Sequence, residues 1–276
     1  MQQHLEVVDP RATPPVWASL RSEALQISKT EPSLASLANA VIIRHKTLSG
    51  ALSYQLARKL GDQELRAMSL RETAEEAFAA DPSIVDKAEA DLRAVFERDP
   101  ACRGYLQPFL YFKGFLALET YRVAHWLWVN DRQALALYLQ SRVSELFQVD
   151  IHPAAVIGAG VFLDHGTGIV IGETAVVGDD VSMLHGVTLG GTGAERGDRH
   201  PKIGKGVLLG AGAKVLGNIR VGDYAKVASG SVVLKEVPPG CTAAGVPARL
   251  VNCPTCDEPA KTMDHTLAAE VYDYVI

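Results

Sequence analysis

Ile151-His-Pro-Ala-Ala-Val156 begins a series of six-residue units, and Ile157-Gly-Ala-Gly-Val-Phe162 and Leu163-Asp-His-Gly-Thr-Gly168 continue it. Each of these units opens on a large aliphatic residue and carries a smaller residue four places later. The phase slips by two after Ile169-Val170, slips again across residues 190–201, and the series ends near Pro239. After the first slip, the opening residues are Ile171, Val177, Met183, Leu189, Ile203, Leu209, Val215, Val221, Val227 and Val233.

This period predicts a parallel β-helix. A helix would place apolar residues three and four apart, and a half-buried strand would alternate in twos. A large inward residue, a turn-tolerant residue and a small residue together describe a short strand and a corner. Three such units close a triangular coil, and each coil buries its aliphatic residues against the coils above and below. The alternative is a Gly- and Val-rich sandwich, but fixed spacing over so long a run is unusual in sandwiches.

Composition excludes several classes of protein. The chain has 276 residues and a formal net charge of −5, with 27 basic and 32 acidic side chains. No basic block favours binding to nucleic acid or to an anionic membrane. No apolar run approaches the roughly 18 residues of a membrane span, and the N-terminus lacks a signal-peptide pattern. We therefore expect a cytoplasmic protein.

The 4 cysteines are too few and too unevenly spaced to predict a disulfide framework. Cys253-Pro-Thr-Cys256 has the spacing of a metal or redox motif, but no second pair completes a zinc site. We expect two free thiols here, in a polar tail.

The residues before the repeats carry helical signals. Ser69-Leu-Arg-Glu72 reads as a capping box at the start of a helix, and Asp81 precedes a proline at the first position of the next one. Residues 109–129 predict one long apolar helix, and Asp131 is expected to cap the last helix. Pro238-Pro239-Gly240 is expected to stop the coils. The predicted domains are a helical domain at 1–147, a repeat domain at 148–251 and a mobile tail at 252–276.

Two places in the repeats carry side chains that packing does not require. Asp164 and His165 occupy a corner where small residues would be sufficient, and an exposed neutral imidazole can act as a base near pH 7. With about eighteen residues in three six-residue units per coil, Asp150 should lie beneath Gly168. Its carboxylate could then reach His165 from the coil below and stabilise the imidazolium.

The second place is the interruption in the series between Thr192 and Pro201, a polar, glycine-rich run that predicts a loop leaving the coil. It contains Arg199, which is suited to holding a carboxylate through two hydrogen bonds, and His200. His152 and His185 are as readily explained by structural roles.

The chain resembles serine acetyltransferases, which are hexapeptide-repeat acyltransferases, and the likeness covers nearly its whole length. The residues that carry the resemblance include the helical Arg98-Asp99-Pro100 and Tyr111-Phe-Lys-Gly114, together with Phe147-Gln-Val-Asp-Ile-His-Pro-Ala-Ala155, Leu163-Asp-His-Gly-Thr-Gly168, Val187-Thr-Leu-Gly-Gly-Thr-Gly193, Gly197-Asp-Arg-His-Pro-Lys-Ile203 and Ala243-Ala-Gly-Val-Pro-Ala-Arg249. The overall expectation is an α+β protein: an all-helical N-terminal domain, a left-handed parallel β-helix and a flexible tail.

The resemblance implies a site and a reaction. His165 would be the general base that acts on the hydroxyl of L-serine, and Asp150 would be its partner. Acetyl-CoA would be a co-substrate in direct transfer within a ternary complex, with no permanently bound cofactor and no metal. Asp99, Asp164, Arg199 and His200 would hold the amine and carboxylate of serine between two subunits, and the backbone of Gly191, Ala211 and Ser229 would contact acetyl-CoA.

The resemblance also implies partners. The assembly would be a homotrimer or a dimer of trimers, and L-cysteine would be a feedback inhibitor that competes with serine. O-acetylserine sulfhydrylase would bind the chain through its C-terminal Ile276, whose carboxylate resembles that of an amino-acid substrate.

Three other functions are weighed against this one. Metal-dependent hydration of carbon dioxide on a β-helix needs three histidines on one metal, and the histidines of the repeats show no pair within a coil. A binding scaffold would not need Asp150, Asp164 or His165. Acetyl transfer to a sugar or another alcohol would not call for a carboxylate clamp at Arg199.

Overall fold

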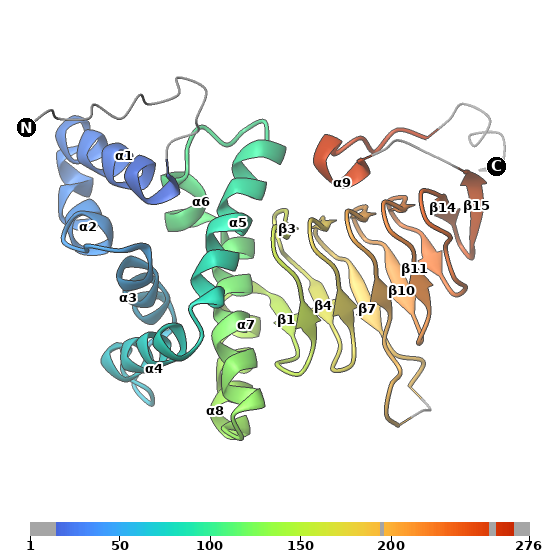
Figure 1. Ribbon diagram of the computed structural model, residues 1–276, viewed down its shortest axis with the longest axis horizontal. Helices are drawn as coiled ribbons and strands as arrows, with labels where there is room; N and C mark the ends of the chain where they lie inside the picture. Colours follow the sequence, from blue (N-terminus) through green and yellow to red (C-terminus); the bar gives the residue numbers. More distant parts are fainter. Residues whose placement is uncertain (1–14, 194–195, 254–257, 268–276) are drawn as a thin grey trace, which may run out of the picture.

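The computed structural model describes residues 15–193, 196–253 and 258–267, and it shows a helical half joined to a solenoid of parallel strands (Figure 1). The helical half contains α1 (Val16–Thr30), η1 (Pro32–Leu34), α2 (Ala35–Ala38), η2 (Asn39–Ile43), α3 (Leu48–Leu60), α4 (Ala67–Ala80), α5 (Ser83–Arg98), α6 (Leu106–Tyr111), α7 (Lys113–Val129) and α8 (Gln133–Phe147). In the part of the chain that is described, no helix combines the length and apolar character needed to span a bilayer.

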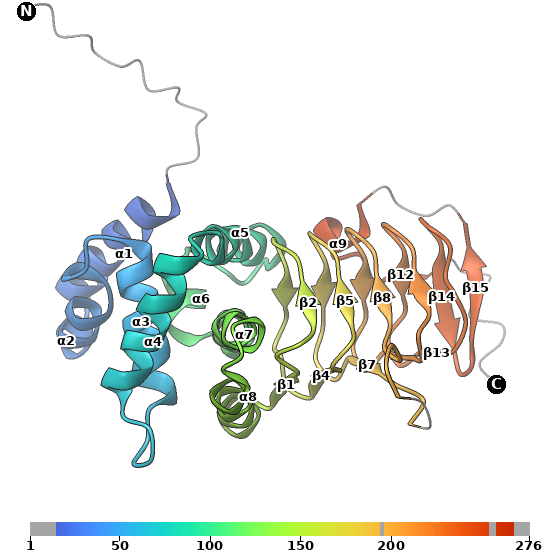
Figure 2. The same ribbon diagram turned by 60° about the horizontal axis from the view of Figure 1, so that its bottom comes forward.

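Helix α7 joins the two halves. It lies between the other helices and the first strands of the solenoid (Figures 1 and 2), and it is buried on all sides through most of its length. A methyl group at Gly114 would overlap the carbonyl oxygen of Leu163, so the backbone of this helix rests directly on the first coil. Farther along α7, Arg122 donates to the carbonyl of Gly158 at 2.8 Å.

Three predicted helix boundaries were wrong. The single helix expected at 109–129 is two helices, because Phe112 is extended (φ −79°, ψ 111°) between α6 and α7. The capping box at Ser69 does not form. Instead, Asp62 turns the chain by accepting the amide of Leu65 at 2.8 Å, and α4 has already begun at Ala67. Asp131 has a left-handed backbone (φ 60°) and does not cap α8, which begins at Gln133.

Asp81 was expected to be the N-cap of α5, but it lies one residue before the cap, which is Pro82. Its carboxylate receives the amide of Ser83 at 3.1 Å, and α5 begins at Ser83 rather than at Pro82.

The solenoid has three sheets, which we name A, B and C. Sheet A contains β1 (Val149–Ile151), β4 (Ile169–Ile171), β7 (Thr188–Gly190), β10 (Lys214–Leu216) and β13 (Val232–Val233). Sheet B contains β2 (Val156–Ile157), β5 (Val176–Val177), β8 (Lys202–Ile203) and β11 (Arg220–Val221). Sheet C contains β3 (Phe162–Leu163), β6 (Ser182–Met183), β9 (Leu208–Leu209), β12 (Lys226–Val227), β14 (Thr242–Gly245) and β15 (Ala248–Asn252).

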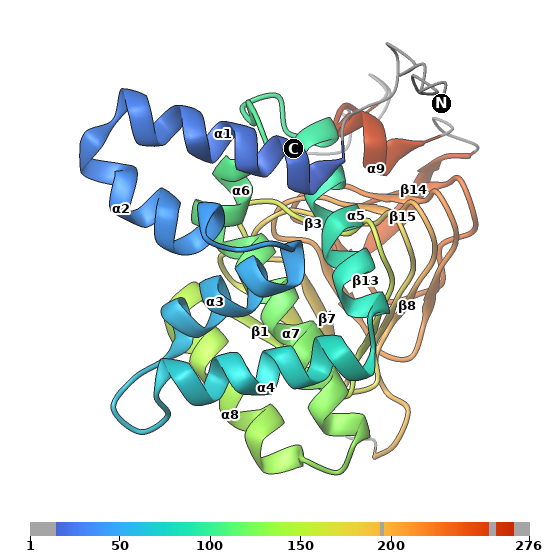
Figure 3. The same cartoon turned by 60° about the vertical axis from the view of Figure 1, so that its left-hand side comes forward.

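The chain visits sheets A, B and C in turn, and each visit to all three makes one coil (Figure 3). The predicted opening residues form the core between the sheets. Ile171, Leu189 and Val215 stack in sheet A through parallel pairing, and all three are buried. The corners from sheet C to sheet A need a left-handed backbone, which glycine adopts at little cost, as at Gly186 (φ 69°). These observations confirm the predicted fold of helices followed by a parallel β-helix.

Two details of the solenoid differ from expectation. Asp150 pairs with Val170 rather than lying beneath Gly168, because the first coil takes in the two extra residues of the phase slip. The coils also continue past Pro238-Pro239-Gly240. Strand β14 follows these residues and pairs with β12 in parallel, and only the antiparallel β15 ends the sheet.

The C-terminal tail is partly folded. Helix α9 (Pro259–Thr262) lies against the outer face of sheet C, where Ser182 donates to the carbonyl of Ala260 at 2.8 Å (Figure 1). Lys226 reaches the carbonyl of Thr266 at 2.6 Å. The expectation of a mobile tail therefore fails for residues 258–267, because the outward side chains of sheet C offer them hydrogen bonds and apolar contacts.

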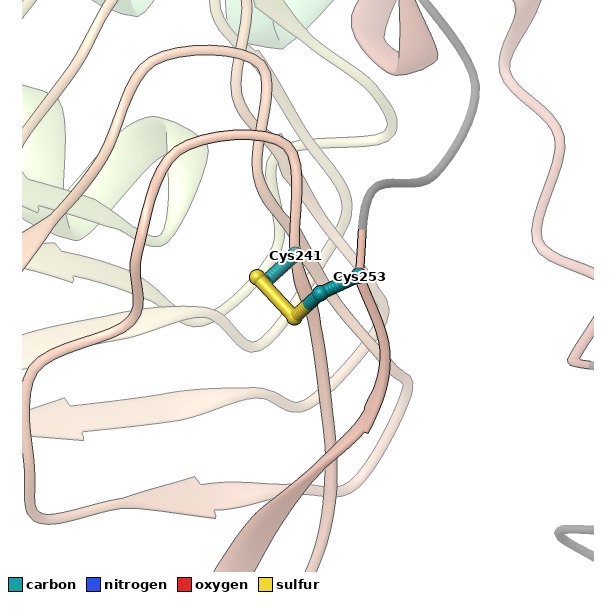
Figure 4. The surroundings of a disulfide bond; sticks show 2 residues. All are labelled: Cys241 and Cys253. Carbon is teal, nitrogen blue, oxygen red and sulfur yellow. A yellow bond between two sulfur atoms is a disulfide. The ribbon is translucent and has the colours of Figure 1, made fainter.

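The expectation of free thiols was also wrong for one cysteine of the pair. Cys253 forms a disulfide with Cys241, because the hairpin of β14 and β15 folds the end of β15 back beside the start of β14 (Figure 4). Cys256 lies outside the described residues, as does Ile276.

Candidate functional site

His165 lies at the first corner, where the chain passes from β3 to β4. Its backbone is left-handed (φ 56°) and its side chain is 73% exposed. Nε2 is 3.7 Å from Oδ1 of Asp164, and the ring of His185 approaches edge-on from the next coil, with centroids 6.0 Å apart. An exposed imidazole beside a carboxylate can accept a proton from a bound hydroxyl group.

Asp164 is less exposed, and its carboxyl does not ionise as easily as an ordinary one. Burial raises its pKa, the nearby charge of Asp99 raises it further, and His165 acts in the opposite direction. Two carboxyl groups close enough to influence one another will attract a cation placed between them. This corner therefore suits an ammonium group.

Asp99 reaches this corner from the helical half. It is the C-cap residue that directly follows α5, and its carboxylate accepts the amide of Ala101 at 2.8 Å. Its own carbonyl accepts the amide of Cys102 at 3.0 Å. These bonds fix the turn after α5, and Cys102 of this turn shares a buried cluster with Phe162 of β3, two residues before Asp164. The charge of Asp99 is close enough to raise the pKa of Asp164.

Asp150 faces outward from β1 and has a partner that the sequence did not suggest. Its carboxylate accepts a hydrogen bond from Nε2 of Gln140 on α8 at 2.7 Å. The two residues lie in a polar groove together with Ser141, Ser144 and Glu145. The pairing of Asp150 with His165 stays a prediction.

The second corner lies between β4 and β5. Arg199 pairs there with Glu173, with Nη2 2.7 Å from Oε2. Thr174 holds the loop in place, since its hydroxyl accepts the amides of Arg199 and His200 at 3.0 and 3.1 Å. The predicted loop does leave the coil between β7 and β8, and it projects from the solenoid (Figures 1 and 2).

His200 is buried and uncharged in this setting. Burial lowers its pKa, and the charge of Arg199 lowers it further. Nδ1 accepts the amide of Thr174 at 3.1 Å, so the neutral ring carries its proton on Nε2. His152 lies near this corner, and burial lowers its pKa as well. The charge of Arg199 and a neutral imidazole donor together suit a carboxylate ligand.

One chain does not bring the two corners together. The His165 corner precedes β4 and the Arg199 corner follows it, so they lie at opposite ends of the strands of sheet A. The residues predicted to contact acetyl-CoA are divided in the same way. Ala211 and Ser229 lie on later coils, at the same end of the sheet A strands as His165, whereas Gly191 lies beside the side chain of Arg199.

Sequence reasoning missed Glu173, Thr174 and Gln140. Glu173 and Thr174 follow Gly172 at a corner, and two polar residues where small ones would be sufficient were a usable signal. Gln140 gave no such signal, because a glutamine on a helix surface is ordinary. Within the described ranges, no three His, Cys, Asp or Glu side chains come together as a metal site.

Comparisons with known proteins give consistent matches. The family model "Serine acetyltransferase, N-terminal" matches residues 16–120, and "Bacterial transferase hexapeptide (six repeats)" matches residues 200–235. The serine acetyltransferase of Salmonella typhimurium is 57% identical over 249 residues, which cover 90% of this chain and 91% of that protein. The enzyme of Escherichia coli K12 is 56% identical with the same coverage.

Solved structures agree with these matches. A serine acetyltransferase in complex with cysteine has a TM-score of 0.90 and 54% identity, covering 92% of this chain and 98% of that one. The Brucella abortus enzyme in complex with coenzyme A has a TM-score of 0.85 and 51% identity, covering 87% and 96%. The soybean enzyme complexed with serine has a TM-score of 0.84 and 54% identity, covering 86% and 97%.

Proposed function

This chain belongs to the serine acetyltransferase family of acyltransferases, and we propose that it moves the acetyl group of acetyl-CoA to L-serine by direct transfer with His165 as the base. His165 takes the proton of the serine hydroxyl as its oxygen attacks the thioester carbonyl. The resulting tetrahedral intermediate expels the thiolate of CoA, which takes up a proton, and O-acetyl-L-serine is left. A thioester has a good leaving group, so base catalysis and positioning are sufficient.

The observation that carries this proposal is the complementary chemistry of the two corners. Asp99 and Asp164 form a site for the amine of serine, while Arg199 and His200 offer donors for its carboxylate. A substrate with both groups needs both corners. Serine bound by the soybean relative and cysteine bound by another relative support an amino-acid site of this kind.

We further propose that the site forms between two copies of the chain. The two corners lie at opposite ends of the strands of sheet A, so one molecule of serine cannot reach both within one chain. In a trimer of parallel solenoids, the His165 corner of one copy would meet the Arg199 corner of its neighbour. Val156 and Val176 support this packing, because they are paired on the outer face of sheet B and partly exposed.

The remaining partners are proposals of the same kind. Acetyl-CoA would lie along Gly191, Ala211 and Ser229, as the coenzyme A complex of the Brucella relative supports. Cysteine would compete with serine for the amine and carboxylate contacts. The assembly would be a homotrimer, or a dimer of trimers joined through the helices, and the cytoplasmic location stays a prediction. A complex with O-acetylserine sulfhydrylase through Ile276 could be tested by comparing binding with and without that residue.

The test is to follow thiol release from acetyl-CoA with and without L-serine. We expect release that depends on serine and falls at least 10²-fold in kcat for His165→Ala, because the general base is lost. The KM for acetyl-CoA should change little, and Asp150→Asn should cost less. Release with a sugar or another alcohol but not with serine would favour the alternative substrate class. Unchanged kcat in His165→Ala would reject this base.

A further inference from the structure

Arg98 is the last residue of α5, and its guanidinium is buried against the second coil. Nη1 donates to the hydroxyl of Ser182 at 3.1 Å and to the carbonyl of Asp180 at 3.3 Å. Nη2 pairs with the carboxylate of Asp180 at 3.3 Å, and only 3% of the Arg98 side chain is exposed. The guanidinium thus holds a corner residue and a strand residue at once.

The partners of Arg98 are fixed themselves. Asp180 has a left-handed backbone (φ 59°) at the corner between β5 and β6, and its amide donates to the carbonyl of Ala159 at 2.8 Å. Ser182 is fully buried in sheet C and donates to the carbonyl of Ala260. The end of α5 is therefore attached to a rigid part of the solenoid rather than to a loop.

Arg98 and Asp99 are neighbours in sequence that meet different coils. Arg98 is bound to the second coil through Asp180 and Ser182. The carbonyl of Asp99 accepts the amide of Cys102, which shares a buried cluster with Phe162 at the end of the first coil. The charge of Asp99 acts on the carboxyl group of Asp164 in that coil. The two coils are joined in register, because the amide of Asp164 donates to the carbonyl of Met183 at 2.8 Å. Fixing Arg98 on one coil thus fixes the distance of Asp99 from the other.

We infer that Arg98 is a positioning residue for the amine subsite: its bonds to Asp180 and Ser182 hold Asp99 beside Asp164. This inference rests on the proposed function, since it takes Asp99 and Asp164 to be ligands of the serine amine. Arg98 itself does not reach the substrate. A carboxylate displaced by about 1 Å can lose much of its contribution to binding and positioning.

The test is the steady-state kinetics of Arg98→Met, which keeps an unbranched apolar stem but removes the guanidinium. We expect the KM for serine to rise about tenfold, with the KM for acetyl-CoA unchanged, because only the amine subsite is disturbed. Arg93→Met is the matched control. Arg93 lies on the same helix and pairs with Glu89 at 2.7 Å in a partly exposed i,i+4 pair, so its loss should leave both constants unchanged.

A double-mutant cycle then shows whether Arg98 acts through Asp99. Asp99→Asn alone should raise the KM for serine, and Arg98→Met should add less than about twofold in that background. A full additional effect of Arg98→Met would overturn the inference, because Arg98 would then act by another route. An unchanged KM in Asp99→Asn would instead contradict the proposed role of Asp99 in the site.

Loss of folding is separated from loss of positioning by milder variants. Asp180→Asn removes the ion pair and keeps the shape of the side chain, and Ser182→Ala removes the hydroxyl acceptor together with its bond to Ala260. If Arg98→Met does not fold, each of these should raise the KM for serine several-fold and leave that for acetyl-CoA unchanged. Wild-type constants in both variants would reject the inference.

Discussion

Gly172 lies against the imidazole of His200, and a methyl group at this position would overlap the ring. We therefore predict that Gly172→Ala displaces His200 and raises the KM for serine about tenfold, with kcat affected less. Steady-state kinetics with serine and with acetyl-CoA check this. The effect should disappear in a His200→Ala background, where no ring remains to be displaced. A further rise in that double variant would mean that Gly172 matters for the coil instead.

At the residue scale, the sequence identified the corner residues but not which residues of other elements lie close to them. Asp164 and His165 were predictable because they interrupt a series of small residues at a corner. Asp99 came only from the family resemblance, since no local pattern places a residue of α5 beside a corner on the solenoid. Gln140 was missed for a similar reason: its contact with Asp150 depends on how α8 packs against β1.

At the scale of elements, α5 and α7 meet in a buried group of charges. Asp91 and Glu119 are fully buried, and Arg122 lies 2.5 Å from Asp91 and 3.6 Å from Glu119. Burial raises the pKa of Glu119 well above its ordinary value, and the charge of Asp91 raises it further. The raised pKa favours the protonated, uncharged form of Glu119 in the folded protein, and Arg122 pairs more closely with Asp91.

This arrangement makes stability depend on pH. Above the ordinary pKa of a glutamate, the folded chain holds a proton on Glu119 that the unfolded chain has lost. Stability then falls as pH rises from about 4.5 towards the raised pKa. Glu119→Gln imitates the protonated form. The melting temperature of this variant should therefore increase relative to that of the parent protein as pH rises. Thermal melts from pH 5 to 8 measure the difference, with the partly exposed Glu89→Gln as a control that lacks this gain. A constant difference would contradict a raised pKa.

The hairpin of β14 and β15 depends on the disulfide between Cys241 and Cys253. The bond closes a loop with a sequence separation of 12 residues, which corresponds to about 3 kcal/mol of chain entropy. Reduction should thus increase hydrogen exchange of the β15 amides while the coils stay protected. The Cys253→Ser variant should show the faster exchange without reductant and no further change with it. Equal exchange in the oxidised and reduced protein would contradict this role.

Sequence patterns predicted the elements where one period repeats and failed where different parts of the chain meet. The aliphatic opening residues gave the inward stack, because each coil imposes the same environment on the same position. The disulfide was not predictable, because it depends on β15 turning back antiparallel beside β14. The folded part of the tail was missed likewise, since Ala260 has no partner until sheet C presents Ser182.

At the scale of the whole molecule, the three outer faces of the solenoid differ. Sheet C is covered by α5 and by residues 258–267, and its outward residues Phe162, Ser182 and Leu208 are buried. Sheet B leaves Val156 and Val176 partly exposed. Sheet A also leaves the outward Val170 exposed. The face of sheet B adjoins the Arg199 corner, since β5 follows that corner directly. A neighbouring copy that covers this face would bring its own His165 corner close to Arg199.

This geometry predicts complementation between two inactive variants. In a trimer with one such contact per copy, each site takes His165 from one chain and Arg199 from the next. Chains with His165→Ala and chains with Arg199→Ala should each show little activity at low serine concentration. In trimers assembled from both, a site is intact when its histidine comes from the Arg199→Ala chain and its arginine from the His165→Ala chain. Every trimer that contains both variants should then have one intact site, which is about a third of its contacts.

The measurement is to co-express the two variants with different affinity tags, purify particles that carry both tags, and compare their serine-dependent thiol release with that of each variant alone. Mixing the separately purified variants is the control, because chains that do not exchange cannot complement. If the doubly tagged particles have the mass of a trimer but stay as inactive as the single variants, the site does not combine these residues across copies. His165 and Arg199 would then have to act within one chain. Their places at opposite ends of the strands of sheet A argue against this.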